Sequence, residues 1–554
     1  KKFHIAPRIA CLIRNREVIG DEAIDQYLNG TIADLHDGML MKGMDQAVDI
    51  LMEKIREGAR IRVIGDYDID GVNATYILLE ALEGLRGEVD MDIPDRITDG
   101  YGLNRNLIDR AFDDGIDTII TCDNGIAAAK EIEYGKALGM TIIVTDHHEV
   151  PYKENEAGRR YILPPADAVV DPRQEGCEYP FKGLCGAAVA YKLVEALCEA
   201  NGQDVADLDY LLENVAIATV ADVMNLTEEN RILVKQGLEM LKRTSNLGLR
   251  ALIQCIGLEG KKIQAYHIGF ILAPCLNASG KLDTAKRALA LLRAKTEREA
   301  DMLAGDLKAL NESRRDMTDR VVDEAMAKVE QTDIRGDKVL VIYLPDCHES
   351  LAGLVAGRVR ENYYRPVFVL TDSEDGVKGS GRSIESYSMY EELTGCGDLL
   401  TKFGGHPMAA GLSLDKENVE KFKRRLNDQC TLSEEELTEK VVIDMELPFA
   451  AITEHFIEEL EYMEPFGKGN TKPVFAARGV VMQHVKIIGK NKNVVKATAI
   501  DAAVNRMEAI CFHDAQEFAK QCERNNGKMS ITFYPGINEF RGERQIQIVI
   551  THYR

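Results

Sequence analysis

The sequence predicts an α/β protein with a helix-covered parallel sheet, a bridging helix, a second α/β domain and a terminal β-barrel. Over residues 50–172, strand-like apolar runs alternate with helical ones, which is typical of a parallel sheet. A charged helical pattern over about 297–330 precedes a second alternating region that opens at Lys338–Tyr343. After about residue 436 the pattern changes to short strands and polar turns, which indicates a small barrel.

The elements follow in order from the apolar spacing. Residues 1–45 have helical spacing and form a predicted helical lead-in. In the first α/β region the expected helices start near Val72 and Ile126. The expected strands of this region are 62–64, 89–93, 118–121, 141–145 and 168–170, and those of the terminal region are 480–488, 494–499, 506–511, 529–533 and 545–550.

Composition places the chain among ordinary globular proteins. Its 554 residues are too many for one core, and the contents of 45% hydrophobic and 29% charged residues are ordinary. We find no apolar run long enough for a membrane span and no secretory leader. The 12 cysteines contain no Cys-x-x-Cys pair, so the sequence predicts neither a zinc cluster nor a disulfide framework. A cytoplasmic protein without a membrane partner is expected.

Charge is distributed unevenly along the chain. The whole chain carries −23, but Gly467–Arg554 contains 14 Lys and Arg against 7 Asp and Glu. This basic end is compatible with binding a polyanion, although a solvated basic face is the commoner explanation of such an excess. Charge alone leaves both interpretations open.

Three acidic turns follow three of the predicted strands. Asp66, Asp68 and Asp70 come after the first strand, and Asp123 and the pair His147-His148 follow two later ones. Because ligands of such sheets bind beyond the carboxyl ends of the strands, we expect one shared divalent-cation site. The histidine nitrogen favours manganese over magnesium or calcium.

Each of these turns also has a simpler interpretation. The Asp-x-Asp-x-Asp-Gly start also fits a calcium-binding EF-hand loop, but its twelfth position falls on Ile77 and a strand precedes it. A structural acidic turn and hydrogen-bonded surface histidines remain alternatives for each motif alone. No Gly-x-Gly-x-x-Gly or Walker motif follows a strand, which disfavours a dehydrogenase or an NTPase.

The ordered motifs resemble the DHH phosphoesterases, and within them the RecJ single-stranded-DNA-specific 5′–3′ exonucleases. The resemblance covers nearly the whole chain, and Asn538–Gly542 belongs to it. Its other pieces are Gly65–Gly71, Cys122–Gly125, Asp146–His148, Gly183–Gly186, Ala218–Val223, Gly379–Ser383, Gly404–Gly411 and Glu464–Asn470. It implies a DHH catalytic domain at 46–285, a connecting helix at 286–335, a DHH-associated domain at 336–435 and an OB-fold at 436–554, after the lead-in at 1–45.

The resemblance also implies roles for the acidic turns. It makes Asp68, Asp70, Asp123, His147 and Asp222 the ligands of two Mn²⁺ ions, with Mg²⁺ as a substitute. Asp123 would be shared between the ions, and His148 would face the scissile phosphate. Asp66 is grouped with these catalytic residues, although it could be a ligand or a hydrogen-bonding partner of one.

Further residues are expected to hold the substrate. The resemblance makes Arg96 a contact of the 5′ end and Ser380, Arg382 and His406 phosphate contacts, with Lys281 as a further phosphate contact. Relatives often carry arginine at Lys281, and a lysine lacks the bidentate fork. A salt bridge for Arg96 and a packed imidazole for His406 are the structural alternatives. In the barrel, Phe533, Tyr534 and Phe540 are either stacking platforms or core residues.

The expected function is hydrolysis of single-stranded DNA from its 5′ end to mononucleotides, in DNA repair and recombination. Two alternatives remain: a catalytically silent single-strand-binding scaffold, and a DHH phosphodiesterase for short oligonucleotides or cyclic dinucleotides. We expect a monomer whose partner is single-stranded DNA, with a single-strand-binding protein and a RecQ-type helicase as candidate protein partners.

Overall fold

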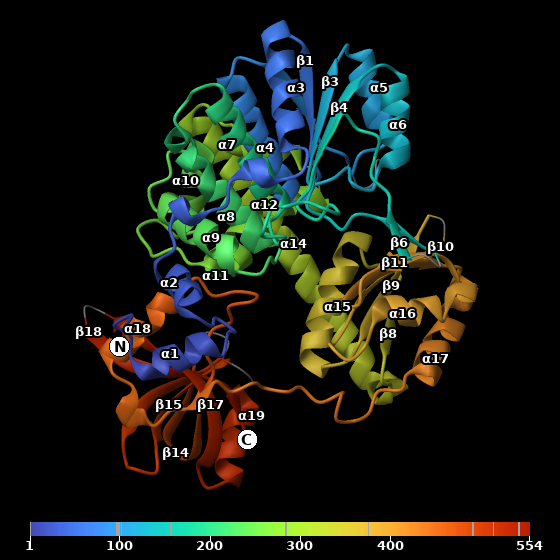
Figure 1. Cartoon of the computed structure of the whole chain (residues 1–554). Coiled ribbons are helices and arrows are strands. Elements are labelled where there is room, and N and C mark those ends of the chain that lie inside the picture. The colour runs from blue at the N-terminus through green and yellow to red at the C-terminus, as the bar shows by residue number, and fades with distance from the viewer. Residues whose placement is uncertain are drawn as a thin grey trace. The chain divides into compact units, whose positions relative to one another are not determined.

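The chain is seen here in a computed structural model that describes residues 2–95, 100, 102–155, 158–282, 285–374, 376–489, 492–512, 515–540 and 543–554. It divides into two compact units. The first comprises Lys1–Gly280, Thr284–Gly305 and Val442–Arg554, and the second comprises Lys281–Asp283 and Asp306–Val441. Figure 1 shows their elements. The two ends of the sequence therefore share one unit.

The first unit contains the predicted parallel sheet. Its strand order is β2-β1-β3-β4-β7, and every pairing is parallel. All five residues of β3 are buried, as expected for a strand covered on both faces. The expected strands are confirmed within two residues at each end, as β1 (Arg60–Ile64), β2 (Glu88–Asp92), β3 (Thr118–Cys122), β4 (Thr141–Thr145) and β7 (Ala168–Val170).

Helices cover both faces of this sheet (Figure 1). On one side lie α3 (Met44–Glu57), α4 (Ile69–Gly84) and α7 (Gly186–Ala200), and on the other lie α5 (Arg105–Asp113) and α6 (Ala129–Ala137). The α5 and α6 side is closed by an aliphatic core that includes Ile108, Ile132 and Ile142. Helix α4 is buried on almost all sides, because α8 and α13 cover the face that points away from the sheet.

The part of the first unit that contains the parallel sheet has further helices and a short hairpin, β5 (Tyr152–Asn155) and β6 (Gly158–Tyr161). No described helix is long and apolar enough to cross a membrane. The further helices are α8 (Leu212–Ala221), α9 (Glu228–Leu241), α10 (Leu247–Cys255), α11 (Ala265–His267), the π-helix η4 (Ile268–Leu272), α12 (Ala273–Leu282) and α13 (Lys286–Leu292).

The expected long charged helix is confirmed as α14 (Glu297–Gln331), a 35-residue helix that runs from the first unit into the second. The second unit has a mixed sheet of order β11-β12-β10-β9-β8. Apolar clusters cover both of its faces. Its elements are β8 (Leu340–Tyr343), α15 (Glu349–Tyr363), β9 (Val367–Ser373), β10 (Gly376–Arg382), α16 (Met389–Thr394), β11 (Leu400–Gly405), β12 (Ala409–Leu414) and α17 (Val419–Gln429).

The terminal barrel is also confirmed. Strands β14, β15, β16, β18 and β17 pair in that order, and β14 pairs with β17 to close the ring. Strands β14, β17 and β18 are longer than the sequence indicated, and α19 fills the connection between β16 and β17. The bounds are β13 (Met445–Glu446), α18 (Glu454–Leu460), β14 (Phe475–Ile488), β15 (Val494–Ile500), β16 (Arg506–Cys511), α19 (Ala515–Arg524), β17 (Lys528–Phe540) and β18 (Glu543–Tyr553).

The N-terminal helices α1 (Pro7–Arg14) and α2 (Asp21–Asn29) belong to the barrel's core. Ile9, Leu12 and Ile13 are buried in the same apolar cluster as Phe475 and Phe533 of the barrel. The buried Arg231 of α9 then ties this assembly to the catalytic helices, since its guanidinium donates to the carbonyls of Tyr27, Tyr462 and Met463 at 2.8–2.9 Å. The barrel therefore has a hydrogen-bonded interface with α9.

Candidate metal centre

The acidic turns meet at the carboxyl edge of the first sheet. Asp66, Asp68 and Asp70 lie where β1 passes into α4, and Asp123 follows the last residue of β3. His147 and His148 follow β4. Asp222 arrives from a different direction, as the C-cap residue of α8. The sheet topology gathers the residues of the three turns, and only helix packing brings Asp222 to them.

The first turn is shaped by a helix cap and a close backbone approach. The Asp68 carboxylate accepts a hydrogen bond from the Gly71 N–H at 3.0 Å, which caps α4. A Cβ on Gly71 would lie 2.4 Å from the carbonyl oxygen of Asp66. A side chain at this position would collide with the backbone of Asp66, so the turn requires glycine. The same tight turn brings Asp66 and Asp68 beside one another.

Asp70 is held by the start of α7. Its two oxygens accept hydrogen bonds from the N–H groups of Gly186 and Ala187, both at 2.7 Å. The positive end of a helix dipole favours a carboxylate in this position. A Cβ on Gly186 would lie 2.6 Å from the Cβ of Asp123, so α7 also packs directly against that residue.

Asp123 occupies a strained backbone conformation. Its φ is +61°, in the left-handed region that non-glycine residues rarely adopt. Strain of this kind persists where the surrounding structure enforces it, and it gathers at functional sites. Here it turns the carboxylate toward the other acids instead of continuing the direction of β3.

The His147 imidazole lies among three carboxylates. Its Nε2 is 3.0 Å from Asp123 Oδ1, 3.5 Å from Asp70 Oδ2 and 3.9 Å from Asp222 Oδ2. Burial lowers the pKa of His147 even though Asp70 opposes this effect, so the ring is neutral at pH 7. A neutral imidazole nitrogen facing carboxylate oxygens is a metal-ligand arrangement.

The donors form overlapping sets that suit two cations. Asp66, Asp68 and Asp123 offer one set, and Asp70, His147 and Asp222 offer another, with donor atoms within 4.8 Å of one another in each. A third set joins Asp123 to the two histidines. Asp123 thus belongs to the first and third sets, and its Oδ1 lies 3.0 Å from His147 of the second. Oxygen-rich sites with one imidazole fit Mn²⁺, and Mg²⁺ in the all-oxygen position.

The electrostatics of the cluster also favour the binding of a cation. Burial and the charge of Asp68 raise the pKa of Asp66 to about 7, and burial with the charges of Asp70 and Asp68 raises that of Asp222 to about 8. The same causes raise the pKa values of Asp68 and Asp123. Carboxylates that repel each other in a buried site become stable in their charged form when divalent ions lie between them.

His148 differs from His147 because Asp146 controls it. Its Nδ1 is 2.7 Å from Asp146 Oδ1, and its side chain is about half exposed. Burial opposes protonation, but the hydrogen bond and charge of Asp146 outweigh it and raise the pKa of His148 to about 9. At neutral pH His148 is therefore a cation whose Nε2 can act as a proton donor.

Asp146 is the functional residue that sequence reasoning left without a role. It is buried and accepts hydrogen bonds from the N–H groups of Ile126, His147 and His148 as well as from the His148 ring. Burial disfavours its charge, yet these contacts lower its pKa. The sequence signal for it was its place immediately before the two histidines. It is a positioning residue for His148.

The predicted substrate contacts come from other segments of the chain, and Ser380, Arg382 and His406 belong to the second unit. Arg96 and the side chain of Lys281 fall outside the residues that the structure describes. Ser380 and Arg382 lie two residues apart on β10, and Arg382 pairs with Ala409 next to the turn that carries the exposed His406. These three residues therefore share one end of the second unit's sheet.

The barrel aromatics divide between core and surface. Phe533 is fully buried and packs against Phe475 and Phe449, so of the two roles left open for it the core role is the one that the structure supports. Tyr534 is half-buried beneath Lys472, whose ammonium lies 3.7 Å from the ring centroid. The side chain of Phe540 lies outside the described residues.

Comparison with known proteins agrees with this architecture. The chain matches the DHH family N-terminal domain over residues 60–219, the DHHA1 domain over 336–432 and the RecJ OB domain over 443–552. It is 37% identical to the single-stranded-DNA-specific exonuclease RecJ of Bacillus subtilis, over 99% of this chain and 68% of that protein.

Solved structures give the same result. RecJ from Thermus thermophilus in complex with Mn²⁺ superposes with a TM-score of 0.82 at 27% identity, covering 99% of this chain and 76% of that one. Its Mg²⁺ complex superposes with a TM-score of 0.76 at 26% identity, covering 99% and 75%.

Proposed function

The chain belongs to the RecJ family of single-stranded-DNA-specific exonucleases, and on this premise we propose that it hydrolyses single-stranded DNA from the 5′ end to mononucleotides. The observation that carries the proposal is that Asp123 belongs to two of the three donor sets at the edge of the sheet and lies 3.0 Å from His147, a member of the remaining set. A carboxylate shared by two cations is the arrangement that in-line phosphoryl displacement uses.

Each residue of the centre has a distinct task in this proposal. Asp68 and Asp123 would hold one Mn²⁺ with Asp66 beside them, and Asp70, His147 and Asp222 would hold the other. When bound, the ions supply an activated water nucleophile and neutralise charge on the phosphate. His148, fixed by Asp146 through Nδ1, donates from Nε2 to a phosphate oxygen, which a charged imidazolium does strongly.

Further residues would bind the DNA through its phosphates. Ser380, Arg382 and His406 lie at one end of the second sheet and present a hydroxyl, a guanidinium and an imidazole that suit phosphate oxygens. Arg96 is proposed to contact the 5′ end and Lys281 a further phosphate. The domain boundaries proposed with these roles are those given by the resemblance above.

The protein's setting is part of the proposal. None of the twelve cysteines is joined in a disulfide, which suits a reducing cytoplasm. An enzyme that acts on single strands needs them exposed, so a RecQ-type helicase and a single-strand-binding protein are suitable partners in repair and recombination. We propose that the chain works as a monomer.

The test is a digest of a 5′-phosphorylated single-stranded oligonucleotide, labelled in parallel at its 5′ or 3′ end. With Mn²⁺ the label at the 5′ end should be released first as a mononucleotide, and a chelator should stop the reaction. Asp123→Ala should cut roughly 10³-fold more slowly while still binding DNA, and Asp49→Ala, which removes an exposed acid of α3, should match wild type.

Other outcomes decide between the alternatives. An intact substrate with Mn²⁺ and unimpaired DNA binding would favour a silent scaffold. Hydrolysis confined to dinucleotides or cyclic dinucleotides would favour the small-substrate phosphodiesterase. Wild-type rates in Asp123→Ala would overturn the assignment of the metal centre.

A further inference from the structure

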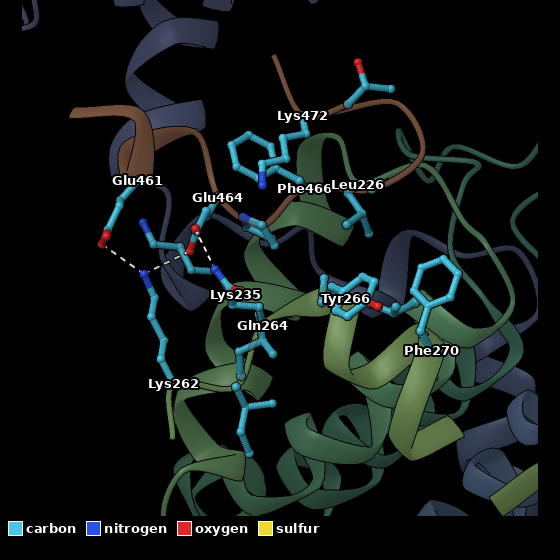
Figure 2. Close-up of a pocket in the computed structure, with 18 of the residues that line it drawn as sticks. Leu226, Lys235, Lys262, Gln264, Tyr266, Phe270, Glu461, Glu464, Phe466 and Lys472 are labelled. Atoms are coloured by element: carbon cyan, nitrogen blue, oxygen red, sulfur yellow. Dashed lines mark hydrogen bonds and ion pairs between the residues drawn. The ribbon is translucent and has the colours of Figure 1, made fainter. Parts of the chain in front are cut away.

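A cavity of about 1170 Å³ lies where the catalytic helices meet the barrel, within the first unit. One wall comes from the end of α8, from α9, and from α11 with η4. The other comes from residues 461–472 and from the β17–β18 ribbon. Figure 2 shows side chains from both walls facing the same space.

This cavity begins beside the metal centre. Ala221 and Val223, the two neighbours of Asp222, both line it. Lys468 on the opposite wall is close enough for its charge to act on the Asp222 carboxylate. The Leu226 N–H also donates to the Lys468 carbonyl at 2.7 Å, which holds Lys468 close to the segment that follows Asp222. A strand whose phosphate lies at the metals can therefore continue into the cavity.

Two exposed aromatic rings stand at its edge. Tyr266 is 60% exposed and Phe270 is 71% exposed, and both line the cavity. Their rings stack with centroids 4.9 Å apart and an angle of 27° between planes (Figure 2). Rings packed for stability are normally buried, whereas this pair leaves large faces open to solvent. We refer to Tyr266 and Phe270 as the aromatic platform.

The backbone under the platform is unusual. Phe270 lies in η4, a π-helical turn, and such turns occur mostly as single insertions at functional sites. Gly269, next to Phe270, packs toward Val220 of α8, since a Cβ built on it would be in ordinary contact with a valine methyl at 3.5 Å. The platform is thereby joined directly to the end of the helix that carries Asp222.

Charge around the cavity favours a polyanion. Lys235, Lys468, Lys472 and Arg544 line it, and Lys468 makes no ion pair within 4 Å among the described residues. Among the lining acids, Glu461 and Glu464 both pair with Lys262, at 2.9 and 3.1 Å, and Glu239 pairs with Lys242 at 2.6 Å. Over the whole lining, six lysine and arginine residues stand against four glutamates.

The two walls are fixed to one another. Gln264, two residues before Tyr266, donates to Glu464 at 2.8 Å across the cavity (Figure 2). With the Lys262 ion pairs, this contact sets the position of the platform relative to the barrel. A preformed surface of this kind loses little entropy when a flexible strand binds.

We propose that the aromatic platform stacks bases of the single-stranded substrate on the 3′ side of the scissile phosphate, while Lys468 contacts the sugar-phosphate chain between the platform and the metals. The inference rests on the proposed exonuclease function and deepens it. Stacking accepts every base, so the platform holds a strand without reading its sequence. It also requires unpaired bases, which adds to the selection against duplexes.

The experiment compares an intact oligonucleotide of about 12 nucleotides with a series that carries one or two abasic residues at successive positions from the 5′ end. Wild type should show a KM about tenfold higher for at least one abasic substrate. Tyr266→Ala and Phe270→Ala should raise KM about tenfold for the intact strand and lose the preference for a base at that position. Phe112→Ala, which removes a 48% exposed ring on α5, is the matched control and should keep the preference.

Tyr266→Phe and Phe270→Tyr retain a ring and should behave as wild type, which separates stacking from misfolding. The platform is refuted if wild type cuts every abasic substrate as well as the intact one. It is also refuted if the alanine variants keep the wild-type KM and base preference. An inactive wild type on all substrates refutes the proposed function itself, and anisotropy with labelled intact and abasic strands then still measures the platform.

Discussion

Replacing Gly186 by alanine tests how closely α7 is packed against the metal centre. An added Cβ would lie 2.6 Å from the Cβ and 2.8 Å from an oxygen of Asp123. The first distance must lengthen by about 0.8 Å to reach ordinary contact at 3.4 Å, and the Cα of Asp123, at 2.9 Å, restricts the direction of that movement. Either Asp123 or the start of α7 has to shift.

Both shifts damage the site. Moving Asp123 displaces a carboxylate that belongs to two of the three donor sets, and moving α7 lengthens the 2.7 Å hydrogen bonds that hold Asp70. A displacement of about 1 Å at a catalytic group costs roughly 100-fold in rate, and overpacking costs about 1–3 kcal/mol of stability. We therefore expect Gly186→Ala to lower kcat about 100-fold at saturating Mn²⁺ while the protein remains folded.

Two glycine variants serve as controls in the same oligonucleotide digest and thermal melt. Gly135→Ala on α6 would meet Ile142 Cδ1 at 2.7 Å away from the metals, so it should lose stability without losing rate. Gly305→Ala, with nothing within 4 Å, should gain about 0.5–1 kcal/mol. A Gly186→Ala enzyme within about threefold of the wild-type kcat would show that the centre tolerates this movement.

Two further predictions concern stability. Burial raises the pKa of Glu213 from 4.5 to about 7, so the folded chain binds this proton more tightly than the unfolded chain and stability falls as pH rises through that window. Glu213→Gln should remove this dependence and gain up to about 3 kcal/mol at alkaline pH, and denaturant unfolding that keeps the wild-type pH slope would contradict it. Arg231→Ala removes the guanidinium donor of three carbonyls at the barrel interface, of which that of Met463 keeps the Asn470 amide as a donor, and should cost about 3 kcal/mol or more in chemical unfolding. The exposed Arg243→Ala should stay within about 0.5 kcal/mol, and equal effects of the two would mean that the Arg231 contacts stabilise nothing.

The secondary structure was largely readable from the sequence because its signals are local. Strands such as Thr141–Thr145 are continuous β-branched runs, which only a sheet buried on both faces accommodates well. Strand β14 starts five residues before the expected strand 480–488, and this start was missed because Arg478 and Gly479 interrupt the apolar pattern there. The place of the N-terminal helices in the barrel's core gave no signal, since their partners lie more than 400 residues away.

The metal centre was predictable only in part. Asp66, Asp68, Asp70, Asp123 and His147 follow strands of one parallel sheet, so topology alone gathers them. Asp222 ends a helix in a different layer, and resemblance to a family, not spacing, singled it out. The role of Asp146 was hidden because hydrogen bonding to His148 depends on side-chain geometry that no pattern encodes.

Sequence by itself determined the elements, their order and the edge of the sheet where the acids gather, because periodicity and chain order fix these locally. Tertiary structure decided the rest: the strained φ of Asp123, the packing of α7 against it, and the cavity that begins beside Asp222. Distances of about 3–4 Å between groups far apart in the chain are set by the simultaneous packing of several helices. Such distances belong to the folded whole and to no segment of it.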